Sequence, residues 1–253
     1  MTEPMATPGQ ATDNTINGLS QVERVVDAYV APTKTFQDIL RNTSWWLPFL
    51  LGVVLAYLFL FAIQHEIGFQ KVAETIAQNK PSLQQRMNSM TPSQLQSMYS
   101  GIAVFVKATL YASPLFILVF ALIGAGVLMV SFNFGLGAQA KFSQYFAVWF
   151  YAGMPLLIKS LLSSITLFAG LGADQFDLNN PVGTNVGFYL GDAPKWVSTL
   201  LQSVDIFTIW TVILMVIGCA TIAKVKRSRA AIVVVGWWVL AILFMTVMAA
   251  IRG

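Results

Sequence analysis

Five long apolar blocks, separated by polar connections, dominate the hydropathy pattern of this chain. A helix needs about 20 mostly apolar residues to cross the hydrocarbon core of a bilayer, with a range of about 17–25, and every block reaches that range. Lipid offers the backbone no hydrogen-bond partners, so each block is expected to be an α-helix. The pattern predicts an all-α integral membrane protein, a bundle of five transmembrane helices over residues 45–63, 108–132, 142–170, 206–223 and 230–251.

Two prolines lie inside these blocks, and two connections have a pattern of their own. Pro114 and Pro155 should kink the second and third helices, because proline cannot donate the hydrogen bond of a helix interior. Apolar residues at helical spacing within 64–100 predict short amphipathic helices on the surface outside the membrane. The connection 171–203 should hold one short helix near residues 194–201.

The segment before the first block divides into two parts. Residues 1–20 have the polar composition of a disordered tail. In residues 21–44 the apolar positions recur at helical spacing and include Val22, Val25, Val26, Tyr29 and Val30. We expect one or two amphipathic helices that lie in the headgroup layer; the alternative is an ordinary soluble helix docked on a loop. Residues 45–253 then form the transmembrane domain.

Composition agrees with a membrane protein. Hydrophobic residues make up 56% of the chain and charged residues only 10%, whereas a soluble domain carries about 25% charged residues. This disfavours a soluble enzyme and a nucleic-acid binder. One Cys and one His are too few for a zinc site, and neither a phosphate-binding Gly-Lys-Ser/Thr loop nor a Gly-x-Ser-x-Gly elbow occurs. We therefore expect no catalytic residues, no metal and no cofactor.

The distribution of Lys and Arg predicts the orientation of the helices. Four cations, Lys224, Lys226, Arg227 and Arg229, lie within six residues in the fourth connection. Cytoplasmic connections are enriched in Lys and Arg, so this turn and the N-terminus should face the cytoplasm and the C-terminus the outside. The same cluster could bind anionic lipid, but we favour a role in fixing topology.

Polar residues near the outer half of the bundle form the candidate site. Lys159 lies near the middle of the third block, where a charge is costly and often functional. Ser163 falls on the same helical face, and Lys107 and Asp205 begin neighbouring blocks on the same side. The hypothesis is an intramembrane polar or lipid-contact site in which the lysines meet Asp205 or an anionic headgroup. The alternative is that both lysines extend to the interface without a specific role.

Local motifs add a resemblance to a known family. The motifs are Pro32-Thr33-Lys34-Thr35-Phe36-Gln37-Asp38-Ile39, then Trp45-Trp46-Leu47-Pro48, then Phe142 to Leu157 with Tyr151, Gly153 and Pro155, and finally Ile209-Trp210-Thr211 through Gly218 and Ala230-Ala231. Their order and spacing over about residues 28–251 resemble the Yip family, the Ypt/Rab-interacting membrane proteins. The resemblance implies a five-helix membrane domain with no enzymatic activity, linked in eukaryotes to vesicle traffic and small GTPases.

This chain differs from the eukaryotic members of the family in two ways. The Asp-Leu-Tyr-Gly-Pro segment of eukaryotic members is missing, and the first outer connection is much longer than theirs. Both make small-GTPase binding doubtful and favour a prokaryotic-type member in the bacterial cytoplasmic membrane. The predicted function is a non-enzymatic multi-pass protein that organises the membrane or partner proteins. Its expected partners are membrane lipids and a membrane protein or a second copy. The alternative is a transporter or channel subunit with a polar path near Lys159.

Overall fold

A computed structural model describes residues 18–171, 176–190 and 193–252, and the chain there is largely helical. The tail predicted for residues 1–20 lies mostly outside the described residues. In chain order the helices are α1 (Gln21–Val30), α2 (Pro32–Ile39), α3 (Trp46–Glu66), α4 (Phe69–Gln78), α5 (Pro81–Met87), α6 (Pro92–Tyr111), α7 (Ser113–Leu136), α8 (Phe142–Ala152), α9 (Met154–Phe168), the short 3-10 helix η1 (Val186–Tyr189), α10 (Lys195–Ser203), α11 (Ile206–Ala223) and α12 (Arg227–Arg252).

Within the described residues, five helical segments are long and apolar enough to cross a membrane, which confirms the predicted fold class. They are α3, α7, the α8–α9 pair, α11 and α12. The second begins at Ser113, five residues later than expected, because Pro114 lies in the first turn of α7 instead of inside a longer helix. A proline is tolerated in a first turn, where its missing N–H has no intrahelical partner. Pro155 likewise begins α9 after a break at Gly153.

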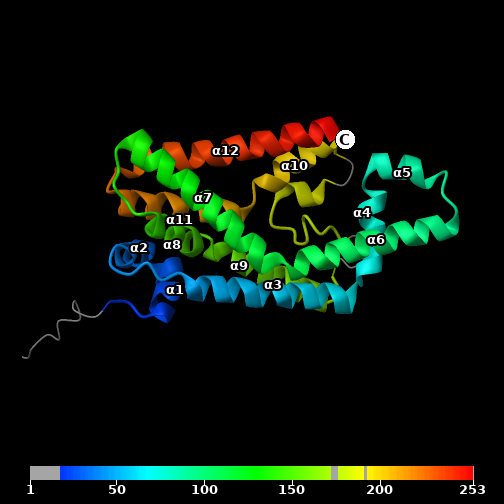
Figure 1. Ribbon diagram of the computed structural model, residues 1–253, viewed down its shortest axis with the longest axis horizontal. Coiled ribbons are helices and arrows are strands. Elements are labelled where there is room, and N and C mark those ends of the chain that lie inside the picture. Colours follow the sequence, from blue (N-terminus) through cyan, green and yellow to red (C-terminus); the bar gives the residue numbers. More distant parts are fainter. Residues whose placement is uncertain (1–17, 172–175, 191–192, 253) are drawn as a thin grey trace, which may run out of the picture.

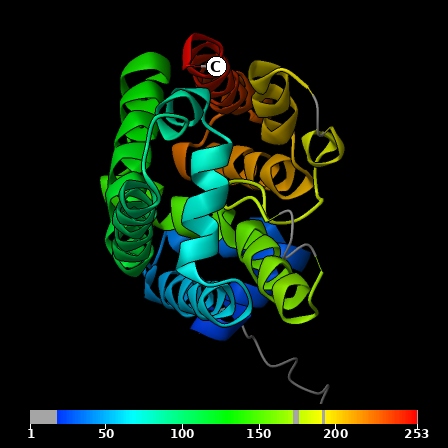
Figure 2. The same ribbon diagram turned by 90° about the vertical axis from the view of Figure 1, so that its right-hand side faces the viewer.

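The spanning segments run along the long axis of the molecule (Figure 1). The α1–α2 hairpin and the turns before α8 and α12 lie at one end, which we call the N-terminal end. Helices α4, α5 and α10 lie at the opposite end with the C-terminus, which we call the C-terminal end (Figures 1 and 2). The short helices expected in residues 64–100 are α4, α5 and the start of α6, and the one expected near 194–201 is α10.

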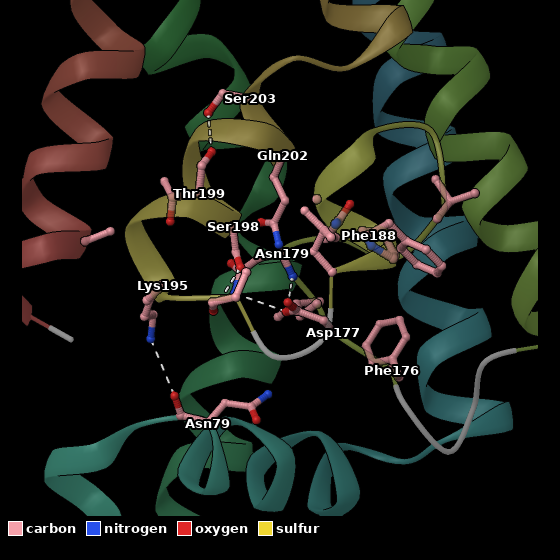
Figure 3. A pocket seen from close by; sticks show the side chains of 18 of the residues that line it. Asn79, Phe176, Asp177, Asn179, Phe188, Lys195, Ser198, Thr199, Gln202 and Ser203 are labelled. Carbon is pink, nitrogen blue, oxygen red and sulfur yellow. Dashed lines mark hydrogen bonds between the residues drawn. The ribbon is translucent and has the colours of Figure 1, made fainter.

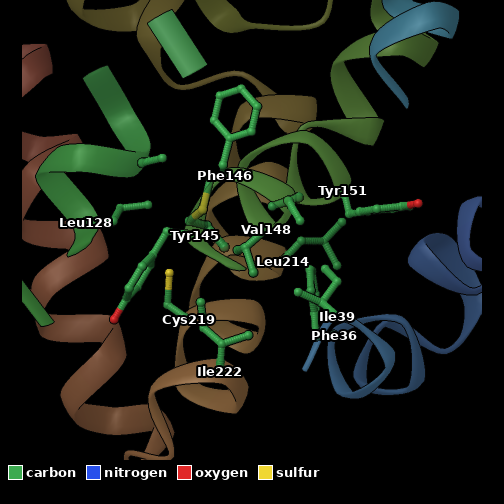
Figure 4. Packing of buried hydrophobic residues seen from close by; sticks show 14 of the residues in the cluster. Phe36, Ile39, Leu128, Tyr145, Phe146, Val148, Tyr151, Leu214, Cys219 and Ile222 are labelled. Carbon is green, nitrogen blue, oxygen red and sulfur yellow. The ribbon is translucent and has the colours of Figure 1, made fainter. Parts of the chain in front are cut away.

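Helix α8 forms the centre of the bundle at the N-terminal end. It packs against α7, α11 and α2, and Tyr145, Val148 and Tyr151 are buried on its different sides (Figure 4). In the apolar stretch of the third span, 50% of the residues are buried inside the protein. The corresponding shares of buried residues in α3, α7 and α12 are 22%, 22% and 11%. A helix that is apolar all round is normally buried, so the exposed apolar faces of α3, α7 and α12 are the surfaces that lipid would cover.

A second core lies at the C-terminal end. Val72 of α4 packs there with Ile63 of α3, Val106 of α6 and Leu167 of α9. Helix α4 thus inserts its apolar face between the ends of three longer helices, and Figure 2 shows it crossing the middle of this end of the bundle. The result is that the segment between α3 and α7 is part of the packed structure.

Gly218 of α11 permits the closest helix crossing in the first core. A Cβ atom there would lie 2.7 Å from Cγ1 of Val148 and 2.9 Å from Cε1 of Phe36. The Val148 side chain is short and the Phe36 side chain is a rigid ring, so neither can move aside freely. Glycine at this position therefore lets α2, α8 and α11 meet at one point.

Gly218→Ala should lower the thermal unfolding temperature of the purified protein, since overpacking a core costs about 1–3 kcal/mol. Gly236→Ala is the matched control, because a Cβ atom there meets nothing within 4 Å and alanine favours helix. Circular dichroism melts in the same detergent would measure both. Equal unfolding temperatures for Gly218→Ala and the parent protein would contradict the close crossing.

Candidate polar sites in the bundle

The structure brings Lys159 of α9 and Asp205, the residue before α11, together. Nζ of Lys159 donates a hydrogen bond of 2.9 Å to Oδ2 of Asp205. The Asp205 side chain is only 1% exposed, and that of Lys159 is 22% exposed. The pair therefore joins the third and fourth spans near the C-terminal end of the bundle.

Asp205 has further partners that fix its carboxylate. Oδ1 accepts hydrogen bonds from the backbone N–H groups of Phe207 and Thr208, so the side chain caps the N-terminus of α11. Oδ2 also accepts a hydrogen bond from the Thr184 hydroxyl, which lies in the connection between α9 and α10. Burial acts to raise the pKa of Asp205, but the hydrogen bonds from Thr184 and Lys159 and the charge of Lys159 hold that pKa below its usual value. The carboxylate is therefore charged at neutral pH.

The other two predicted members of this site lie in different surroundings. Ser163 is nearly buried one turn after Lys159, and its hydroxyl donates to the Lys159 carbonyl oxygen over 2.9 Å. Lys159 and Ser163 line a small cavity of about 200 Å³ beside Phe59. Lys107 is exposed on α6, 5.9 Å from the ring centre of Phe69, and forms no ion pair with Asp205. The break before α7 leaves Lys107 on a helix that packs with α4, outside the five spans.

The cationic cluster lies in the turn between α11 and α12. Lys224, Lys226, Arg227 and Arg229 are all exposed. Lys224 ends α11 in the left-handed conformation, with φ of 54°. Nη2 of Arg227 donates a hydrogen bond of 3.3 Å to the Thr33 hydroxyl at the start of α2. The cluster is thus held at the N-terminal end, beside the α1–α2 hairpin.

Arg24 of α1 forms a buried polar cluster that sequence reasoning missed. Its side chain is fully buried, and Nε donates to Oδ2 of Asp38 over 2.5 Å. Its Nη atoms donate to the backbone carbonyl oxygens of Asp38, Asn42 and Ser44. These bonds connect α1 to the end of α2 and to the segment that leads into α3. Arg24 therefore fixes the hairpin to the first span.

The periodicity of residues 21–30 gave part of the information needed to predict that Arg24 is buried. It separates a valine face from a face with Arg24 and Ala28, but it does not say which face is buried. Val22, Val26 and Val30 are 66%, 52% and 74% exposed, whereas Arg24 and Ala28 are fully buried. The usual burial of valine and exposure of arginine is inverted here, and four of the five N–H donors of the buried arginine have acceptors. The valines remain available to surroundings outside the protein.

Five apolar spans, with an internal ion pair between two of them, define a multi-pass helical membrane protein. The family model for the Yip1 domain matches residues 26–248, so the chain belongs to the Yip1 family. This confirms the resemblance that the motifs between residues 28 and 251 indicated. Neither the curated proteins nor the solved structures contain a match.

A double-mutant cycle should measure the coupling between Lys159 and Asp205. Lys159→Met should lower the free energy of unfolding by about 3 kcal/mol, because it leaves a buried carboxylate without its cation. Asp205→Asn should cost less, since asparagine still caps α11 and the partly exposed lysine can reach water. The double variant should be more stable than the sum of both losses predicts.

Thermal unfolding in one detergent would measure all four proteins of this cycle. Lys107→Met is the matched control and should change stability by less than about 0.5 kcal/mol, as exposed substitutions usually do. Strictly additive losses in the cycle would show that Lys159 and Asp205 do not stabilise one another.

Proposed function

We propose that this Yip1-family protein is a non-catalytic membrane-organising protein that acts on lipids and membrane partners through its α1–α2 hairpin. The observation that carries the proposal is the outward valine face of α1 on a hairpin fixed by Arg24. A loosely attached helix could turn this face inward, but the Arg24 bonds hold the opposite face against the bundle. The exposed face must then meet lipid or another protein.

The surroundings of the hairpin favour the headgroup layer of a membrane. Lys34 and Arg41 are exposed on and just after α2, and the cationic cluster contacts α2 through Arg227. Helices that lie in the membrane interface combine an apolar face with nearby cations. Trp46, 51% exposed at the start of α3, is of a residue type enriched at this level. These features support the interfacial role expected for residues 21–44.

The same cations support the proposed orientation. With the N-terminal end in the cytoplasm of a bacterial cell, the cluster would face an anionic leaflet, where each Lys or Arg contributes about 1 kcal/mol of attraction. The C-terminal end with α4 and α10 would then face outward. An odd number of spans places the two chain ends on opposite sides.

A transporter or channel subunit remains the second candidate, with a path near Lys159. Within the described residues, the charge of Lys159 is paired with Asp205, and the adjoining cavity is only about 200 Å³. A closed pair between two spans supports a structural role for these residues. Ion flux through reconstituted vesicles that is lost in Lys159→Met would favour transport instead.

The valine face should enter lipid in a reconstituted bilayer. In a Cys219→Ala background, an environment-sensitive fluorophore on Val26→Cys should be quenched by lipids spin-labelled near the headgroup, because this residue faces the interface. The matched control is Glu23→Cys, which is also exposed on α1 but next to the helix N-cap. Equal quenching by a water-soluble agent at both positions, with no quenching by lipid, would overturn the interfacial proposal.

Chemical labelling should report the orientation in intact bacterial cells. In the same background, a membrane-impermeant maleimide added from outside should label Lys80→Cys at the C-terminal end and leave Lys226→Cys unlabelled until the cells are opened. Both residues are exposed, so access to the reagent decides the result. Labelling of Lys226→Cys in intact cells would reverse the proposed orientation.

A further inference from the structure

A large cavity lies at the C-terminal end of the bundle, away from the hairpin. It has a volume of about 1700 Å³ and lies between α4, α10, α12 and the described part of the connection that contains η1 (Figure 3). Pockets for small molecules usually measure about 300–1,000 Å³. The size and the open form of this cavity suit an extended molecule better than a small metabolite.

One wall of the cavity is formed by the polar face of the amphipathic helix α10. Ser198, Thr199 and Gln202 of α10 line the cavity, so this helix turns its polar face inward. Nζ of Lys195 donates a hydrogen bond of 3.4 Å to the carbonyl oxygen of Asn79, which ties the start of α10 to the end of α4. Figure 3 shows this bond closing the cavity between the two helices.

A second part of the lining is apolar and belongs to a membrane span, α12, which packs beside α10. Phe244, Met245 and Met248 of α12 line the cavity. Phe244 and Met245 are 68% and 58% exposed, so this wall continues into the lipid-facing surface of α12. These residues lie four to eight positions before the end of α12 at Arg252, which is about 6–12 Å along the axis at 1.5 Å per residue. In a bilayer that the five spans cross, this distance from the end of α12 is the one expected for the boundary between acyl chains and headgroups.

The charges of the lining favour an anion. Among the residues that the structure describes, Lys80 and Lys195 line the cavity with one carboxylate, Asp177. Oδ1 of Asp177 is occupied by the backbone N–H of Asn179, 2.9 Å away. A lysine ammonium has three donors, and Lys195 uses one of them on Asn79. The polar end of the cavity thus offers cationic donors.

We propose that this cavity binds one phosphate-bearing amphiphile from the surrounding leaflet, a phospholipid held in a defined orientation. Its acyl chains lie along Phe244, Met245 and Met248, and its phosphate lies near Lys80 and Lys195. Lipid enters sideways, because the apolar wall is open to the bilayer. The inference needs only the five-span fold and is independent of the role proposed for the hairpin.

Native mass spectrometry of the full-length protein in detergent, titrated with phosphatidylglycerol, tests the proposal. One lipid should bind before any others. Lys80→Gln/Lys195→Gln should weaken that first binding about tenfold, as expected for the loss of two cations near a phosphate. The matched control is Lys71→Gln/Arg86→Gln, which removes two cations from the same end of the molecule that do not line the cavity; its affinity should be unchanged.

A second pair of variants keeps the test independent of charge. Thr199→Phe should obstruct part of the cavity and lower the occupancy of the first lipid, whereas Leu243→Phe, on the lipid-facing surface outside the lining, should not. Circular dichroism and size-exclusion profiles like those of the parent protein would show that each variant folds. Equal affinity for the parent protein and Thr199→Phe would overturn the proposal. Displacement of the lipid by inorganic phosphate alone would also overturn it, because the ligand would then be the free anion.

Discussion

A charge that is removed from water must find its partner within the protein, and Lys159 and Asp205 meet this condition together. The spans that carry them otherwise contact each other through apolar side chains, which lipid could replace at little cost. The hydrogen bond from Lys159 to Asp205 has a defined direction. The Asp205 carboxylate also accepts hydrogen bonds from the backbone of α11 and from the Thr184 hydroxyl. The register between the third and fourth spans and the position of the connection above them follow from this one contact.

The break at Gly153 lets one span serve two different surroundings. Before the break, α8 lies in the apolar centre of the bundle and contacts α7, α11 and α2. After the break, α9 packs mainly against α3 and α11 and carries the polar pair. A straight helix could not occupy the centre at one end and leave it at the other. At the C-terminal end, Leu167 of α9 shares the second core with Val72 of α4.

Hydropathy was sufficient to predict the five spans, because the thickness of the hydrocarbon core sets a minimum length for each apolar block. It misplaced the start of the second span, since Ala108 to Tyr111 carry no charge and continue into the apolar block but complete α6. Pro114 contained the missing information, because a proline fits a first turn better than a helix interior.

The candidate site was predictable only in part. Sequence position placed Lys159 and Asp205 toward the same side of the membrane, but their contact depends on which spans are neighbours. Thr184 comes from a connection whose path no periodic pattern describes. Burial of Arg24 was not predictable, because it depends on three carbonyl groups that the folded end of α2 and the segment just after it supply. The cavity between α4, α10 and α12 needs three separate helices and has no local signature.

The Arg24 cluster also has a consequence for biogenesis. The ribosome releases α1 and α2 first, yet α2 packs on α11, and Phe36 meets Gly218 there. Tyr151 of α8, whose ring lies 5.8 Å from the Arg24 guanidinium, is also synthesised much later. The hairpin therefore cannot complete its docking until the fourth span has left the translocon.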